Sequence, residues 1–214
     1  MELLLTYLPE LLSISVVAIL MAISPGADFV MITRNSLFHG RLSGLYSALG
    51  IGLAIWVHVA YSIAGLALLI AQSVLLFSII KYLGAAYLIY IGYRTFTARG
   101  TPELDGDSPA GDAELSRGQA FRLGFVTNVL NPKTTLFFLS IFTQLVNPDT
   151  PISIQLLYGA IISLAHLFWF SALSLFFSHP ALVRQFNSYK RAIERAVGGV
   201  LMAFGIKVAT MNQT

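Results

Sequence analysis

The sequence predicts an all-α integral membrane protein with six transmembrane helices, arranged as two inverted three-helix repeats whose first helices are broken. Of its 214 residues, 56% are hydrophobic and 11% are charged, and the mean hydropathy is +0.75. A soluble domain carries about a quarter charged residues. No Asp, Glu, Lys or Arg occurs in residues 42–80 or 150–183, and each stretch exceeds the roughly 20 residues of one bilayer crossing.

Apolar segments give the expected spans in order. A five-span alternative stays open, because Lys81 shortens the third segment and residues 71–81 would then lie along the membrane interface. The first segment is expected to be retained rather than cleaved, since Glu2 is its only early charge and a signal peptide begins with positive charge. The expected spans are 8–32, 43–70, 74–95, 120–146, 152–178 and 193–211.

Residues 97–118 differ from the rest of the chain. They are acidic, rich in Gly and Pro, and without aromatics, which predicts a flexible cytoplasmic linker between a first repeat (1–96) and a second (119–214). Ten of the 13 basic residues fall in or beside the first, third and fifth connections, and the other three are Lys81, Lys133 and Lys207. Basic loops stay in the cytoplasm, so those connections are predicted to be cytoplasmic and both termini outside.

The two halves show weak internal similarity. "LGAAYLIYIGYR" (83–94) aligns without gaps with "AVGGVLMAFGIK" (196–207), and similar offsets pair Pro25 with Pro132 and His58 with His166. Because each repeat has an odd number of spans, the second repeat would have the opposite orientation in the membrane. Inverted repeats of this kind are typical of transporters, whose binding site lies near the midplane of the bilayer. Chance similarity between hydrophobic helices is the alternative.

Helix breakers and polar residues interrupt the first span of each half. Pro25 with Gly26, and Pro132, are expected to break the helices, because proline lacks an amide donor and glycine relaxes the turn. Irregular backbone at membrane depth must be buried in protein or line a cavity. The polar residues beside the breaks are Asp28 in the first half and Asn128, Asn131 and Lys133 in the second.

An ionisable side chain within a span indicates function by default. Asp28 and Lys133 are therefore predicted to bind substrate, and a buried pair of them would reduce each other's desolvation cost. The alternative is that both lie at span ends and extend to the headgroups. His58 and His166 are each either a proton relay or a packed residue with one hydrogen bond. The ladder Gly40, Gly44, Ala48, Gly52 predicts a smooth helix face for close packing, within the protomer or between protomers.

Absent motifs exclude other classes. The sequence has no cysteine and no His, Asp or Glu at metal-ligand spacing, so no metal is expected. It lacks GxxxxGK[ST], HExxH and GxSxG, so no nucleotide cofactor and no enzymatic hydrolysis are expected. No basic stripe interleaved with aromatics suggests nucleic-acid binding.

Four segments carry a resemblance to a known family: "SPGADFVMITRNSLFHGRLSGL", "GLAIWVHVAYSIAGLALL", "KYLGAAYLIYIGYR" and "FRLGFVTNVLNPKTTLFF". Together they resemble the LysE/RhtB family of bacterial amino-acid exporters, and the branch for homoserine, homoserine lactone and threonine. The resemblance implies an inner-membrane, multi-pass carrier that exports amino acids, is coupled to proton entry and works as a homodimer. Ala27 departs from the family, which commonly has a second proline there.

These observations together predict a site for a zwitterion. Lys133 and free helix amides would receive the substrate carboxylate, and Asp28 would receive the ammonium group or a proton. Asn128 and Asn131 would donate neutral hydrogen bonds to the substrate, and Asp28, His58 and His166 are the candidates for proton coupling. Two other classes stay open: a passive channel for small neutral solutes, and a non-transporting membrane scaffold.

Overall fold

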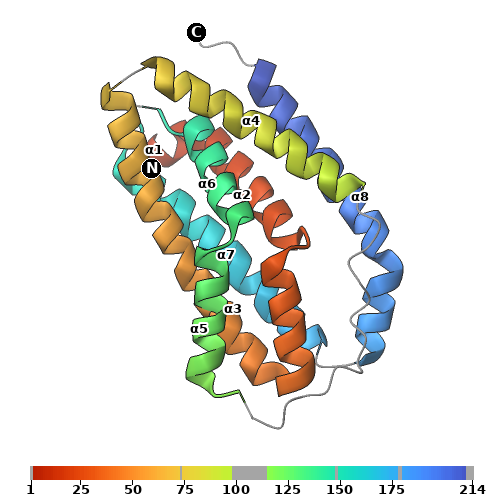
Figure 1. Cartoon of the computed structure of the whole chain (residues 1–214). Coiled ribbons are helices and arrows are strands. Elements are labelled where there is room, and N and C mark those ends of the chain that lie inside the picture. Colours follow the sequence, from red (N-terminus) through yellow and green to blue (C-terminus); the bar gives the residue numbers. More distant parts are fainter. Residues whose placement is uncertain (1, 73, 98–114, 148, 178–179, 211–214) are drawn as a thin grey trace.

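The computed structural model describes residues 2–72, 74–97, 115–147, 149–177 and 180–210. All regular secondary structure in these ranges is α-helical. Figure 1 shows an elongated bundle in which most helices run along the long axis. The helices are α1 (Glu2–Thr6), α2 (Leu8–Ile23), α3 (Ala27–Gln72), α4 (Val74–Phe96), α5 (Arg117–Val129), α6 (Pro132–Leu145), α7 (Ile152–Phe177) and α8 (Pro180–Thr210).

The predicted linker, 97–118, lies largely outside the described residues, which resume at Leu115. Its last residues begin a helix instead of a loop. Ser116 caps α5, because its hydroxyl accepts from the Gln119 amide and its own amide donates to the Gln119 side chain. This reciprocal capping box satisfies two amides at the helix start.

The long helix α3 contains one interruption, at Gly40. Its φ of 79° and ψ of 169° are not helical, and such a conformation is open essentially to glycine alone. The segment from Ala27 to His39 is thus a short helix with a break at each end. Within the chain Gly40 takes no part in the predicted packing ladder, since a Cβ built there would meet no packing neighbour within 4 Å. Gly44 and Gly52 do pack against other side chains.

Helices from the two halves interlock. The second part of α3 packs against α5 and α7, α2 packs against α7, and α4 packs against α8, with the last pair on one side of the bundle (Figure 1). At the α3–α5 contact the backbones nearly touch, because a Cβ on Gly124 would overlap the carbonyl oxygen of Ser47. Small residues permit this close approach.

Among the described residues, buried apolar side chains form two separate clusters. The large cluster draws on α2, the second part of α3, α4, α6, α7 and α8, and includes Met21, Phe138 and Tyr158. The small cluster joins both parts of α3 to the end of α7. Its members are Phe29, Ile32, Ala48, Ile51, Phe170, Leu173 and Phe177.

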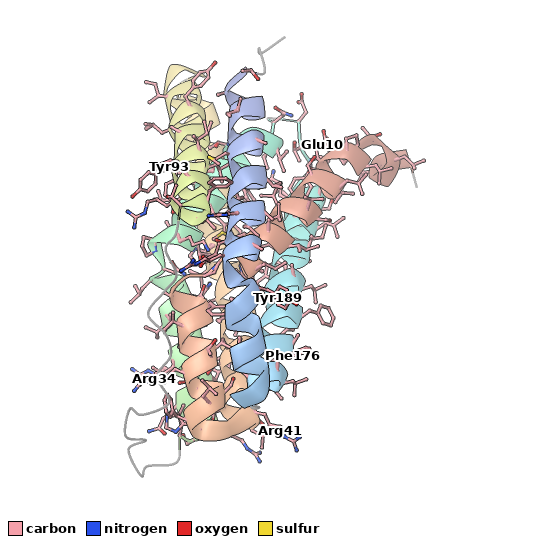
Figure 2. All side chains as sticks on the ribbon, turned by 90° about the vertical axis from the view of Figure 1, so that its right-hand side faces the viewer. Glu10, Arg34, Arg41, Tyr93, Phe176 and Tyr189 are labelled. Atoms are coloured by element: carbon pink, nitrogen blue, oxygen red, sulfur yellow. The ribbon has the colours of Figure 1, made fainter. Side chains whose placement is uncertain are left out.

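Many large apolar side chains lie on the outer surface. Within the described residues, two helical stretches, Ala27–Gly65 and Ile152–Phe177, have the length and hydropathy to cross a membrane, and Leu8–Ile23 is a shorter apolar helix. Large apolar side chains point outward, such as Phe168, which is 71% exposed. Figure 2 shows Glu10 toward one end of the bundle and Arg34 and Arg41 toward the other. Apolar sides with charges at the ends suit a bilayer.

Candidate functional site

The first helix break lies between α2 and α3. Helix α2 ends at Ile23, and Ser24 turns to an extended conformation with ψ of 120°. Pro25 has no amide hydrogen to continue the ladder, and the helix resumes when the Val30 amide donates to the Gly26 carbonyl at 3.0 Å. The carbonyls at the end of α2 therefore lack intrahelical partners.

The second break lies between α5 and α6 and is centred on Asn131. The Asn131 amide donates to the Asn128 carbonyl at 3.0 Å, which closes the end of α5. Its side-chain oxygen accepts from the Lys133 amide at 3.0 Å, which caps the start of α6, and Pro132 occupies the first turn. Proline is favoured at that position, because its missing amide hydrogen would have no partner in the helix.

Asp28 joins the two breaks. Its side chain is 6% exposed and lies in the first turn of α3, where the helix dipole favours negative charge. Its Oδ2 accepts hydrogen bonds from the side-chain amides of Asn128 and Asn131, both at 2.9 Å. Its Oδ1 is buried and has no hydrogen-bond partner among the described residues.

Lys133 bridges the same two breaks in the opposite direction. Its ammonium nitrogen donates to the carbonyl oxygens of Ser24 at 2.7 Å and Pro25 at 3.5 Å. These carbonyls end α2, where the helix dipole favours positive charge. The predicted pairing of Asp28 with Lys133 is therefore not a direct hydrogen bond here: the carboxylate binds side-chain amides and the ammonium binds main-chain carbonyls.

Both charged groups line one cavity of about 10 Å³. That volume holds roughly one water molecule. Met21 of the large cluster lies on its wall, as do Phe29 and Phe170 of the small cluster, so the cavity lies between the two apolar clusters. The remaining lining residues are Ser24, Gly26, Asp28, Asn131, Lys133 and His166.

His58 and His166 have different surroundings. His166 lines the cavity, and its Nδ1 bonds to the Ile162 carbonyl of its own helix at 2.9 Å. His58 is fully buried away from the cavity lining, with its Nε2 3.1 Å from the Asn128 carbonyl and its Nδ1 2.6 Å from the Tyr61 hydroxyl. The structure thus brings His166, but not His58, to the cavity wall.

Sequence reasoning missed several members of this site. The carbonyls of Ser24 and Pro25 are main-chain groups that any residue would supply, so no side-chain pattern marks them. Tyr61 carried a usable signal, because it lies three residues after His58 on one helix face. Phe29 and Phe170 resemble any other apolar residue of a membrane helix. Among the described residues, no group of three or more His, Asp or Glu could hold a metal ion.

Comparison with known proteins gives the family. A family model described as LysE type translocator matches residues 19–212. The chain belongs to the LysE family. It is 35% identical to the uncharacterized membrane protein YrhP of Bacillus subtilis, over 97% of this chain and 98% of the relative. Members of the LysE family are membrane transporters.

Two further relatives of this LysE-family chain have functional names. One is the threonine efflux protein of Escherichia coli, 28% identical over 91% of this chain and 95% of the relative. The other is the leucine efflux protein of Salmonella choleraesuis, 30% identical over 91% of this chain and 92% of the relative. No solved structure gives a significant match.

Proposed function

We propose that this chain is a secondary transporter that exports small amino acids or derivatives, of the threonine, homoserine or homoserine lactone type, across the bacterial inner membrane by proton antiport. One observation carries the proposal: two helix breaks meet so that the Asp28 carboxylate and the Lys133 ammonium line one cavity. The efflux proteins for threonine and leucine among its relatives support an amino-acid substrate.

The two charges suit the two ends of a zwitterion. Asp28 has one buried oxygen that finds no hydrogen-bond partner among the described residues, and an ammonium group or a proton would satisfy it. Lys133 lies in the first turn of α6, where the helix dipole favours an anion, so its ammonium would receive the substrate carboxylate after leaving the carbonyls of Ser24 and Pro25. Asn128 and Asn131 donate to Asp28 in this conformation and would exchange to the substrate when it binds.

Proton coupling follows from competition at Asp28. The carboxylate takes either the substrate ammonium or a proton, but not both. Substrate loading from the cytoplasm releases the proton inward, and a proton arriving from outside releases the substrate outward. His166 on the cavity wall is the second group placed to exchange a proton with Asp28 or the substrate.

The closed cavity supports a carrier rather than a channel. About 10 Å³ cannot contain an amino acid, so the site must widen during transport. Apolar clusters lie on two sides of it, and a continuous water path through both would be needed for passive flow. Alternating access, with one cluster parting at a time, fits this arrangement.

Symmetric contacts between α4 and α8 support six spans in two inverted repeats. The sequence offset of 113 pairs Ala85 with Gly198, Ile89 with Met202 and Gly92 with Gly205. In the structure Gly92 faces Met202 and Gly198. Its equivalent, Gly205, faces Ile89 and Ala85. A twofold axis requires such reciprocal contacts. Helix α4 also runs unbroken from Val74 to Phe96, which favours six spans over five.

We extend the proposal to orientation and assembly. The end of the bundle with Arg34 and Arg41 (Figure 2) is taken as cytoplasmic by the positive-inside rule. A homodimer in the bilayer is proposed from the family resemblance. Chemical cross-linking in native membranes, with a monomeric product as the contrary result, tests the assembly.

Transport is tested with purified protein in liposomes loaded with radiolabelled threonine, homoserine or leucine. We expect efflux that accelerates when the outside is made more acidic than the inside. Protein-free liposomes give the background rate. Efflux that ignores the proton gradient would indicate a channel, and efflux at the background rate for every amino acid would indicate a scaffold.

A further inference from the structure

His58 is fully buried in the second part of α3, beside the end of α5. Its ring stacks on Phe138 of α6, with ring centroids 5.3 Å apart and planes inclined by 19°. This contact fixes the ring plane, so the two nitrogens point in set directions. The hydrogen-bond partners of the two nitrogens therefore indicate which nitrogen carries the hydrogen.

Both ring nitrogens have partners that define the position of the hydrogen. Nε2 lies 3.1 Å from the carbonyl oxygen of Asn128. A carbonyl oxygen can only accept, so Nε2 must carry the hydrogen. Nδ1 lies 2.6 Å from the Tyr61 hydroxyl, which can donate to it. The two bonds together are satisfied by a neutral ring with its hydrogen on Nε2.

His58 binds the carbonyl of Asn128, which lacks its usual helical donor because of Pro132. In a continuous helix the Asn128 carbonyl would accept from the amide of residue 132, but Pro132 has no amide hydrogen. The carbonyl instead accepts from the Asn131 amide at 3.0 Å and from His58. His58 Nε2–H thus replaces the donor that the helix break removed.

Asn128 links this bond to the site. The same residue that offers its carbonyl to His58 donates its side-chain amide to Asp28 at 2.9 Å. We propose that His58 is a positioning residue: as a neutral ring it holds the end of α5, and through Asn128 it aims a donor at the Asp28 carboxylate. This role replaces the proton relay that the sequence suggested for His58, and it rests on the proposed role of Asp28 in transport.

Four variants test the proposal in the reconstituted full-length protein. His58→Gln removes the titratable ring but retains a terminal amide that can donate to the Asn128 carbonyl. His58→Leu removes the donor and keeps an apolar side chain. Tyr61→Phe removes only the hydroxyl that fixes the ring hydrogen. His39→Gln is the matched control, since His39 lies at the far end of the first α3 segment from Asp28.

We expect His58→Gln to keep the pH profile of efflux and a rate within about threefold of the parent. We expect His58→Leu to raise KM and lower the rate by roughly tenfold or more, because a buried carbonyl loses a donor. Tyr61→Phe should fall between them, and His39→Gln should match the parent. A flattened pH profile in His58→Gln, or parent-like KM and rate in His58→Leu, would overturn the proposal.

A second measurement does not depend on transport. In protein labelled with ¹⁵N-histidine, the resonances that disappear in His58→Gln should report a neutral ring with hydrogen on Nε2 from pH 5.5 to 8. A resonance that titrates in this range would refute the positioning role. If the parent protein shows no efflux of any amino acid, the proposed function fails, and the resonance still decides the state of His58.

Discussion

Replacing Asp28 with asparagine isolates the charge of the site from its shape. The asparagine oxygen can take the place of Oδ2 and accept the two 2.9 Å bonds from Asn128 and Asn131. Its amide then takes the place of Oδ1, which has no partner among the described residues. The variant should therefore fold with the same contacts and lack only the negative charge.

The effect on stability should be small because two terms oppose each other. Hydrogen bonds to a charged acceptor are about twice as strong as neutral ones, so the two bonds together lose roughly 2 kcal/mol. Removing a buried carboxylate also removes a desolvation cost of several kcal/mol. We expect the free energy of unfolding to change by no more than about 2 kcal/mol, which is a Tm shift of at most ~8 °C for a chain of this size.

The effect on transport should be large. An ammonium group about 4 Å from a carboxylate gains on the order of 4 kcal/mol at an effective dielectric constant of 20. Each 1.4 kcal/mol is about a factor of ten in affinity, so complete loss of this attraction corresponds to roughly a thousandfold. Hydrogen bonding to the asparagine oxygen would recover part of it, and we expect efflux to fall at least ~100-fold and to lose its response to pH.

The assay compares parent, Asp28→Asn and Asp149→Asn in liposomes at equal protein content. Asp149 is exposed between α6 and α7 and lies outside the cavity lining, so its variant should transport like the parent. Thermal unfolding in detergent verifies that all three proteins fold. Efflux by Asp28→Asn within threefold of the parent, with the same pH response, would refute the assignment of Asp28.

Three further substitutions test the surrounding structure, with thermal unfolding as the common measurement and Gly65→Ala, in open space, as the control. Lys133→Met leaves the Ser24 carbonyl without its 2.7 Å donor, so we expect efflux to be lost and stability to fall by about 1–3 kcal/mol; unchanged efflux would remove Lys133 from the site. Gly40→Ala should cost about 1–3 kcal/mol from backbone strain alone, since φ is 79° and no neighbour is near; a parent-like Tm would argue against this conformation. Gly124→Ala should cost about 1–3 kcal/mol by forcing α5 away from Ser47, and an unchanged Tm would mean that the helices do not approach so closely.

Parts of the fold were predictable because they depend on local chemistry. Proline cannot donate to a helix wherever it lies, so the interruptions beside Pro25 and Pro132 follow from the sequence alone. Asp28 and Lys133 each lie within three residues of one of these prolines, so their placement beside the two breaks was predictable, and in the structure both line one cavity. Gly40 was misread, because a glycine in a regular ladder of small residues looks the same whether it packs or bends the chain.

The partners within the site were not predictable from the sequence, because they depend on how the helices are rotated. His58 and His166 align in the internal repeat, yet one ring faces the end of α5 and the other faces the cavity. A rotation of a few tens of degrees about a helix axis would exchange such environments. Lys133 likewise binds carbonyls rather than Asp28, since ordered main-chain acceptors at the end of α2 lie within its reach.

Under the proposed proton antiport, the small cluster bears on the energy supply of the cell. Among the described residues it has seven buried side chains, and the edge-on contact of Phe29 with Phe177, 5.7 Å between centroids, is part of it. If the small cluster stayed open while the large cluster was also open, protons would cross the membrane without any amino acid being exported. A weakened barrier would then act as an uncoupler, and its cost would be slow growth on respiratory carbon sources, even in cells that have no surplus amino acid to export.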